Sequence, residues 1–288
     1  MQRIEGRRKI KDTCFVGLNS YKEKGSAVIS DKQELIIELV SFINCSSDSD
    51  GGVICYCPKV DSASFTLSSS LFRNSVSSEN GGALFVDSTS HCYTFLIRNN
   101  TFDNCECGGS CDGGAIYLKI KESELSNPIV SACSFIDCKK ALYLDIPSSQ
   151  TIHSSYFAFS DGYALKWIES GEELSLKSCV FNKNTLICED VSNMIFDNCY
   201  SNADNVIINY PTLIQTNTPE AQYERIYNTY MKNQNKQSYI DLSNEATPYL
   251  KGSSASVTNL EDVSFDGMHK SEDRTTVDSR IMNPGFLY

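Results

Sequence analysis

Short apolar runs, separated by small clusters of polar residues, recur through most of this chain. The runs are rich in Val, Ile, Phe and Tyr, and they are bounded by Gly, Ser and Asn. Runs of this length and composition are typical of β-strands and are too short for amphipathic helices. The clearest predicted strands are residues 34–40, 65–67, 93–97, 115–120, 141–144 and 174–176.

Two phrases repeat in a fixed order along these runs. The first is an aromatic residue followed by a small polar cluster, at Phe42-Ile43-Asn44-Cys45, Phe72-Arg73-Asn74-Ser75, Phe102-Asp103-Asn104-Cys105, Phe135-Ile136-Asp137-Cys138 and Phe196-Asp197-Asn198-Cys199. The second is a glycine pair opening a strand, at Gly51-Gly52-Val53-Ile54, Gly81-Gly82-Ala83-Leu84 and Gly113-Gly114-Ala115-Ile116. Residues 27, 53, 83, 115, 141 and 164 mark successive coils at intervals of 23 to 32 residues. This period predicts a single-stranded parallel β-helix, because the leucine spacing of a leucine-rich repeat is missing.

Stacking of equivalent positions explains the residue types in both phrases. The Phe residues are expected to form an interior column, with Phe15, Phe157 and Phe181 in the remaining coils and a one-residue insertion near Phe157. The Asn residues suit a tight left-handed corner and can bond to one another along the stack. The glycine pairs are expected to give a second corner its positive φ. Two weaker coils are predicted around residues 186–187 and 206–207.

The phrases resemble the repeats of the polymorphic outer-membrane protein family of chlamydiae and of related surface proteins of some protozoa. That family is marked by G-G-A-[ILVY] and F-x-x-N. The segments at Gly81 and Gly113 match the first motif, Phe181-Asn182-Lys183-Asn184 matches the second, and the other aromatic phrases are an F-x-x-C variant. The resemblance covers about residues 14–210 and implies a right-handed β-helix of pectin-lyase type with a surface, adhesin-like role.

The pattern divides the chain into four parts. Residues 1–13 are a basic N-terminal segment, and residues 14–210 hold about eight coils. Residues 211–250 are a capping segment with a predicted helix at 219–233, where Pro219 suits a first helical position and an apolar stripe follows at helical spacing. The helix is expected to cover the last coil, with membrane or partner binding as its alternative role. Residues 251–288 are rich in Ser, Asp, Glu and Thr and are predicted to be a flexible tail.

Composition excludes some partners. The formal net charge of −11 and the lack of a basic stripe argue against nucleic acid. No apolar run is long enough for a transmembrane segment, and the charged start lacks the apolar core of a signal peptide. Localisation is therefore left open, with the cell surface or extracellular space favoured by the family resemblance. Either an alternative start site or a longer parent protein would reconcile these observations.

The chain is cysteine-rich, with 13 cysteines, and their disulfide pairing is left open. Cys45, Cys105, Cys138 and Cys199 follow the aromatic phrase and are interpreted as small interior side chains. The segment 105–111 is expected to hold a loop disulfide or loop thiols, because a structural zinc site needs four ligands. Asp48-Ser49-Asp50 is interpreted as a polar turn and not as a calcium loop. No cofactor and no metal site are predicted.

Catalytic constellations are missing from the sequence. His91, His153 and His269 have no catalytic companion, and no acidic pair recurs beside a basic residue in a strand. The leading hypothesis is therefore a non-catalytic surface or extracellular β-helix. The alternatives are a polysaccharide lyase or glycoside hydrolase of the same fold, and an intracellular scaffold or inert gene-family remnant.

The longest coil intervals place surplus residues in loops on one side of the rod, mainly at 57–64, 88–93 and 121–128, with a further insertion at 105–112. Such insertions often form the binding face of a repeat protein. An unknown protein or glycan partner at a cell surface is expected to contact Tyr56, Lys59, His91, Tyr93 and Lys121. Two glycosylation sequons begin at Asn44 and Asn99. If the chain is secreted, Asn99 is predicted to carry the glycan, because Asn44 is expected in the inward or corner ladder.

Overall fold

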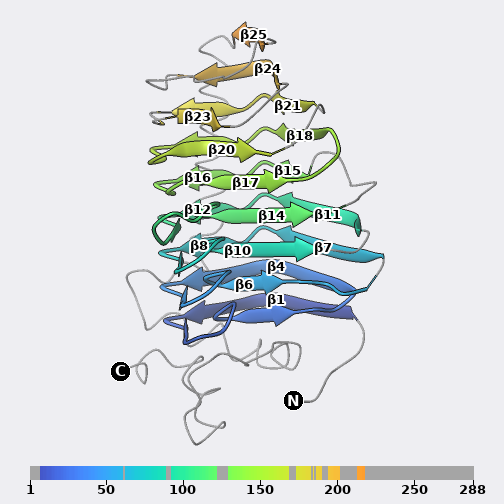
Figure 1. The fold of residues 1–288 in the computed structure, drawn as a ribbon, viewed down its shortest axis with the longest axis vertical. Helices are drawn as coiled ribbons and strands as arrows, with labels where there is room; N and C mark the ends of the chain where they lie inside the picture. Colours follow the sequence, from blue (N-terminus) through green and yellow to red (C-terminus); the bar gives the residue numbers. More distant parts are fainter. Residues whose placement is uncertain are drawn as a thin grey trace, which may run out of the picture.

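A computed structural model describes residues 7–60, 62–88, 92–121, 129–168, 173–182, 184, 186–189, 194–201 and 213–217. These residues form an all-β parallel solenoid, and they include no helix. Successive coils lie one on another in chain order (Figure 1). The predicted parallel β-helix is thereby confirmed as a stack of about six turns.

Three parallel sheets run along the stack. Sheet C contains β3 (Val28–Ser30), β6 (Ile54–Tyr56), β10 (Leu84–Ser88), β14 (Ile116–Ile120), β17 (Leu142–Asp145), β20 (Tyr163–Trp167) and β23 (Leu186–Glu189). Sheet B contains the short strands β2 (Asn19–Ser20), β5 (Ser46–Ser47), β9 (Val76–Ser77) and β13 (Glu106–Cys107). In each coil that has all of these elements, the chain passes from sheet A to sheet B and then to sheet C.

Sheet A has two arms. The first arm contains β1 (Arg7–Val16), β4 (Glu34–Ile43), β7 (Ala63–Ser68), β11 (Cys92–Arg98), β15 (Val130–Ser131), β18 (Gln150–His153), β21 (Leu174–Lys177), β24 (Met194–Ser201) and β25 (Leu213–Asn217). The second arm contains β8 (Leu71–Arg73), β12 (Thr101–Asp103), β16 (Ser134–Ile136), β19 (Tyr156–Ala158) and β22 (Val180–Asn182). β1, β4 and β24 continue from one arm into the other. Each of the clearest predicted strands overlaps an observed strand. The bounds agree to within one residue except that β4 and β7 extend beyond the predicted 34–40 and 65–67.

The first coil begins earlier than the sequence pattern predicts. β1 pairs with β4 from Arg7 onward, and its alternation turns Ile10 into the core. Lys9 projects outward and forms an ion pair with Glu38, with 2.8 Å between Nζ and Oε2. Two of the basic residues, Lys9 and Lys11, therefore lie on the outer face of a strand.

The predicted interior column of phenylalanines is confirmed. Neighbouring rings stack with centroids 4.7 to 5.1 Å apart, in the order Phe15, Phe42, Phe72, Phe102, Phe135, Phe157 and Phe181. The insertion expected near Phe157 does not occur, because Phe157 pairs in register with both Phe135 and Phe181. Phe159 takes the corner position with φ 58° and remains 46% exposed.

The phrase at Phe196 lies in the other arm of sheet A, so its expected place in the phenylalanine column is wrong. Phe196 pairs with Leu176, and Cys199 consequently stacks on Cys179. The phrase fits either arm because each arm ends at a left-handed corner that is followed by a small interior residue. Cys45, Cys105 and Cys138 do occupy the predicted column and are fully buried.

The glycine pairs serve two different purposes. Gly81 has φ 69°, which confirms the predicted positive-φ corner. Gly82 is required for space, since a Cβ there would collide with the carbonyl oxygens of Gly114 in the next coil and of Glu106. The second glycine therefore allows successive coils to approach closely.

The corner between the two arms of sheet A is held by an interior polar column. Asn100 is 1% exposed, and its Oδ1 accepts a hydrogen bond of 2.9 Å from the backbone N–H of Ser70. Its Nδ2 donates to the carbonyl oxygen of Leu67 over 3.0 Å. At the next corner along the coil, Asn184 makes the same two kinds of bond, to the N–H of Ser160 and the carbonyl of Phe157. These side chains satisfy backbone groups that the bends remove from the sheet ladders.

β23 confirms the weaker coil predicted at residues 186–187. The coil predicted at 206–207, the capping helix at 219–233 and the tail at 251–288 lie outside the described residues.

Candidate functional site

Loops leave the solenoid where the strands of sheet C end. These strands are in register, with Val86 of β10 paired to Tyr56 of β6, and Ser88 paired to Ile120 of β14. Residues 57–62 and 121–129 connect two of these strands to sheet A, whereas residues 31–33 and 146–149 suffice in other coils. The connections after β6 and β14 therefore begin, at Cys57 and Lys121, along one edge of the sheet, which we call the sheet C edge.

Tyr56 does not belong to the exposed surface of this edge, so the expectation that it faces a partner is wrong. Its side chain is fully buried and stacks on Phe65 with 5.3 Å between ring centroids. The hydroxyl lies within hydrogen-bonding distance of backbone carbonyl oxygens, among them those of Lys32 at 3.0 Å and Ser64 at 3.1 Å. Strand alternation places Tyr56 inside because Ile54, two residues earlier, faces the core.

The other predicted contact residues are placed differently. Lys59 and Lys121 are exposed on the sheet C edge. Tyr93 lies in β11 and not on a loop, at a register shift between Cys92 and Thr94. The shift absorbs one surplus residue of this coil as a bulge. His91 lies outside the described residues.

The two sequons have the opposite exposure to the one expected. Asn44 is an exposed corner residue with φ 54°, and its Oδ1 accepts a hydrogen bond of 2.8 Å from Asn74. Asn99 is half-buried, has φ 58° and donates its Nδ2 to Ser69 Oγ over 3.0 Å. Strand alternation fails at Asn99 because this residue is itself a corner. Glycosylation of Asn99 in a secreted chain stays a prediction.

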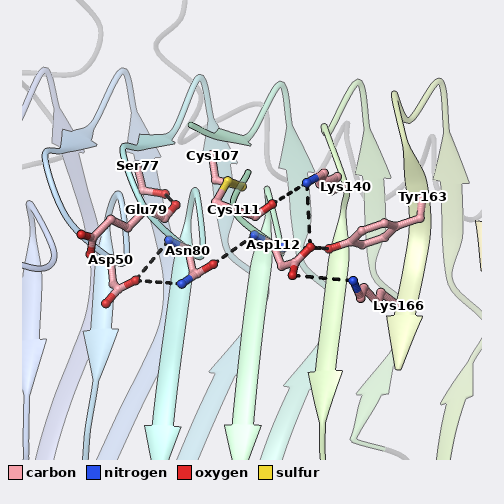
Figure 2. The surroundings of a disulfide bond; sticks show 11 residues. Asp50, Ser77, Glu79, Asn80, Cys107, Cys111, Asp112, Lys140, Tyr163 and Lys166 are labelled. Atoms are coloured by element: carbon pink, nitrogen blue, oxygen red, sulfur yellow. Dashed lines mark hydrogen bonds and ion pairs between the residues drawn. A yellow bond between two sulfur atoms is a disulfide. The ribbon is translucent and has the colours of Figure 1, made fainter. Parts of the chain in front are cut away.

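A polar ladder follows the corner between sheets B and C. Asp50 Oδ1 accepts hydrogen bonds from the backbone N–H and the Nδ2 of Asn80, at 3.1 and 3.3 Å. Asn80 Oδ1 in turn accepts the backbone N–H of Asp112 over 3.0 Å. Figure 2 shows the three side chains in successive coils, beside the disulfide that joins Cys107 and Cys111. Asp50 therefore has the structural turn role predicted for it.

Asp112 ends this ladder in a cluster with two lysines (Figure 2). Lys140 and Lys166 lie 3.9 and 3.8 Å from its carboxylate oxygens. The Tyr163 hydroxyl donates to Asp112 Oδ1 over 2.7 Å and accepts the N–H of Gly113 over 3.2 Å. Lys140 also donates to the carbonyl oxygen of Cys111 over 2.7 Å. This cluster was not found from the sequence, because its members are separated by up to two coils.

An aromatic ladder lies on the outer face of sheet C. Phe85, Tyr117 and Tyr143 stack with centroids 5.1 and 4.4 Å apart. Burial raises the pKa of both tyrosine hydroxyls. Because the faces of the middle ring are covered by its neighbours, this ladder stabilises the stack and offers a ligand only ring edges and hydroxyl groups.

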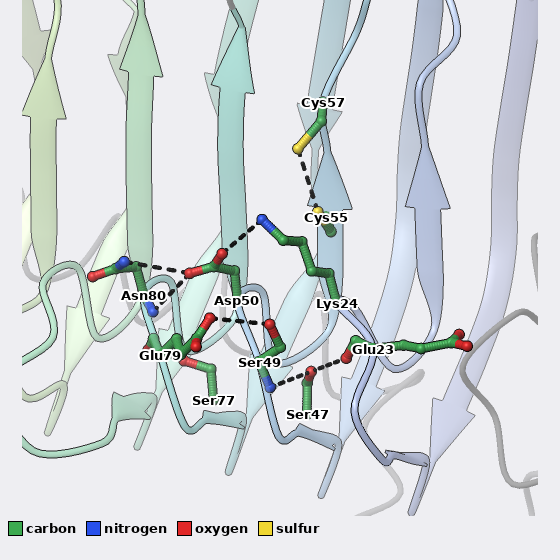
Figure 3. Close-up of polar contacts among 10 residues, drawn as sticks. All are labelled: Glu23, Lys24, Ser47, Ser49, Asp50, Cys55, Cys57, Ser77, Glu79 and Asn80. Atoms are coloured by element: carbon green, nitrogen blue, oxygen red, sulfur yellow. Dashed lines mark hydrogen bonds and ion pairs between the residues drawn. The ribbon is translucent and has the colours of Figure 1, made fainter.

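A pair of thiols lies next to the aromatic ladder. Cys55 and Cys57 have their sulfur atoms 3.5 Å apart. Lys24 reaches toward them from the preceding coil, with its Nζ 2.8 Å from Asp50 Oδ2 (Figure 3). The same Nζ lies 4.7 Å from the centre of the Phe85 ring.

Most of the other described cysteines are interior side chains. Cys45, Cys105, Cys133, Cys138 and Cys179 are at most 1% exposed. Burial raises the pKa of the Cys45 thiol to about 11 and that of Cys133 to about 12. Within the described part of the chain, no group of three or more His, Cys, Asp or Glu side chains is arranged to hold a metal ion.

No family model matches the chain, and no curated protein or solved structure gives a significant match. The residues placed by the structure contain no helix of the length and apolarity needed to cross a membrane.

Proposed function

We propose that this chain is a non-catalytic, adhesin-like β-helix of the cell surface or extracellular space, and that it binds a protein or glycan through the sheet C edge. The proposal includes a right-handed coil of pectin-lyase type and kinship with the polymorphic outer-membrane protein-like repeats. The motifs at Gly81 and Gly113, which open β10 and β14, support that kinship.

The observation that carries the proposal is the common exit of the insertions from sheet C. Strand ends in register force the connections after β6 and β14 to leave from equivalent corners of the rod. Lys59 and Lys121 are exposed there, two coils apart, with the coil of β10 between them. Variable loops held by a rigid scaffold are the usual arrangement of a binding surface.

The side chains around Asp112 pair with one another. Around Asp112, the carboxylate faces two lysines and the Tyr163 hydroxyl both donates and accepts a hydrogen bond. Such mutual pairing holds successive coils together. Tyr163 is 2% exposed, and its hydroxyl is hydrogen-bonded within the cluster.

The test uses the labelled full-length chain, a glycan array, and cultured cells with and without glycosidase treatment. We expect K59A/K121A to lower binding several-fold, because charges at the rim of an interface steer association. The matched control is K177A, which removes an exposed lysine from β21 in sheet A. Equal binding by K59A/K121A, K177A and the unmodified chain would refute a contact at the sheet C edge.

A second candidate function is favoured by the cluster of Asp112, Lys140 and Lys166. Two cations beside one carboxylate leave a net positive charge that could face an acidic sugar, so a polysaccharide lyase or hydrolase of this fold is the alternative. Incubation with polygalacturonate should give no unsaturated or reducing products. Turnover that is lost in D112N or K166M would favour the enzyme and overturn the non-catalytic proposal.

A further inference from the structure

Cys55 and Cys57 form a thiol pair on the outside of the solenoid. Strand alternation turns Ile54 and Tyr56 into the core and both cysteines outward. Cys55 is 2% exposed, whereas Cys57 is partly exposed at the first position after β6. Their sulfur atoms, 3.5 Å apart, need to approach by only about 1.5 Å to reach disulfide bonding distance.

The surroundings of the pair distinguish the two thiols. The pKa of Cys57 is lowered, first by the hydrogen bond from Cys55 and then by the positive charge of Lys24 and a hydrogen bond from the Asp87 backbone, while burial and the charge of Asp87 oppose the shift. The pKa of Cys55 is raised by the same hydrogen bond and by burial. Asp50 also faces the pair and holds Lys24 beside it (Figure 3). Of the two thiols, Cys57 therefore loses its proton first, and Cys55 is the one that keeps it.

The interior thiols provide a contrast within the same molecule. Cys45, one corner away in the same coil, is fully buried and its Sγ faces the carbonyl oxygens of Phe15 and Ile43. Thiol reactivity requires both thiolate character and access. Of these three cysteines, only Cys57 combines the two.

We propose that Cys57 and Cys55 are the attacking and resolving cysteines of a thiol–disulfide exchange site that reacts with exogenous disulfides. The Cys57 thiolate attacks one sulfur of the exogenous disulfide, which forms a mixed disulfide and releases one thiolate. The Cys55 sulfur then attacks Cys57 Sγ and passes its proton to the departing thiolate. Two protein thiols are oxidised to one disulfide, and the exogenous disulfide is reduced to one thiol and one thiolate.

The first experiment measures reactivity in the folded full-length chain. After mild reduction and removal of the reductant, the protein is treated with limiting iodoacetamide, and the remaining thiols are labelled with a second alkylator after denaturation. Trypsin releases residues 33–59 as one peptide that contains Cys45, Cys55 and Cys57. We expect Cys57 to react at least about tenfold faster than Cys45. Equal rates at Cys45 and Cys57 would overturn the proposal.

The second experiment uses oxidised glutathione as the exogenous disulfide. The unmodified chain should gain a disulfide between Cys55 and Cys57, located in the 33–59 peptide and separate from the Cys107–Cys111 bond. C55S should stop at one glutathionyl group on Cys57, and C57S should leave Cys55 unmodified. Slow labelling of Cys45 in each variant shows that its coil is folded. The proposal is wrong if C55S gains no glutathione at Cys57 or if C57S is modified at Cys55.

Discussion

Asn100 offers the sharpest test of how the bends of this solenoid are stabilised. Its side chain accepts from the N–H of Ser70 and donates to the carbonyl of Leu67, and it is 1% exposed. Asn100→Ala leaves both backbone groups without these partners. Each buried unpaired group costs about 1–3 kcal/mol, so the loss of two partners should lower the free energy of unfolding by about 2–6 kcal/mol.

The chain itself indicates a rescue variant and a control. Serine occupies the same column in other coils, where Ser70 Oγ accepts the N–H of Val40 at 3.2 Å and Ser155 Oγ accepts that of Cys133 at 3.3 Å. Asn100→Ser keeps an acceptor and should recover about half of the loss. The control, Asn104→Gly, removes an exposed hydrogen bond to Asn74 at a residue with φ 52°, where glycine is unstrained, and should cost about 1 kcal/mol or less.

Urea unfolding followed by tryptophan fluorescence suits this comparison, because Trp167 is the single tryptophan and is 1% exposed. The expected order of stability is the unmodified chain and Asn104→Gly, then Asn100→Ser, then Asn100→Ala. If Asn100→Ala were no less stable than Asn104→Gly, or Asn100→Ser no better than Asn100→Ala, then the corner hydrogen bonds would not stabilise the bends.

Two further predictions concern coil spacing and alkaline pH. Gly82→Ala should lower the free energy of unfolding by about 3 kcal/mol or more, because the added Cβ would collide with backbone atoms. The control, Gly17→Ala, has open space around the added Cβ but φ 68°, and it should cost about 1–2 kcal/mol. Equal shifts of the urea midpoint in the two variants would contradict this reasoning. Burial raises the thiol pKa of Cys45 to about 11 and of Cys133 to about 12, from 9.0. Above pH 9.0 the unfolded chain therefore loses protons that the folded chain keeps, so stability should fall as the pH rises toward these values. The decline should be smaller in Cys133→Ser, and a stability independent of pH up to about 11 would disprove the argument.

Much of the fold could be predicted from local pattern. The Phe column and the Gly81 corner were confirmed because stacking repeats the same local requirement in every coil. The phrase at Phe196 was assigned to the wrong arm of sheet A, because two corners of each coil require the same residue types, a left-handed residue followed by a small interior one. Tyr56 was expected on a loop because the residues around an aromatic at a strand end do not show whether its side chain points into the core or into solvent.

The sequence by itself determined the β-strands, the parallel stack and the small residues at the corners, since these depend on neighbours along the chain and on a repeated period. Only the tertiary structure decided which polar residues meet. Asp112, Lys140 and Tyr163 come together because each coil returns the chain to the same corner, about 4.8 Å further along the stack. Lys24 lies beside Cys55 and Cys57 for the same reason. It is one coil away in space but tens of residues away in the sequence, so local pattern does not reveal the contact.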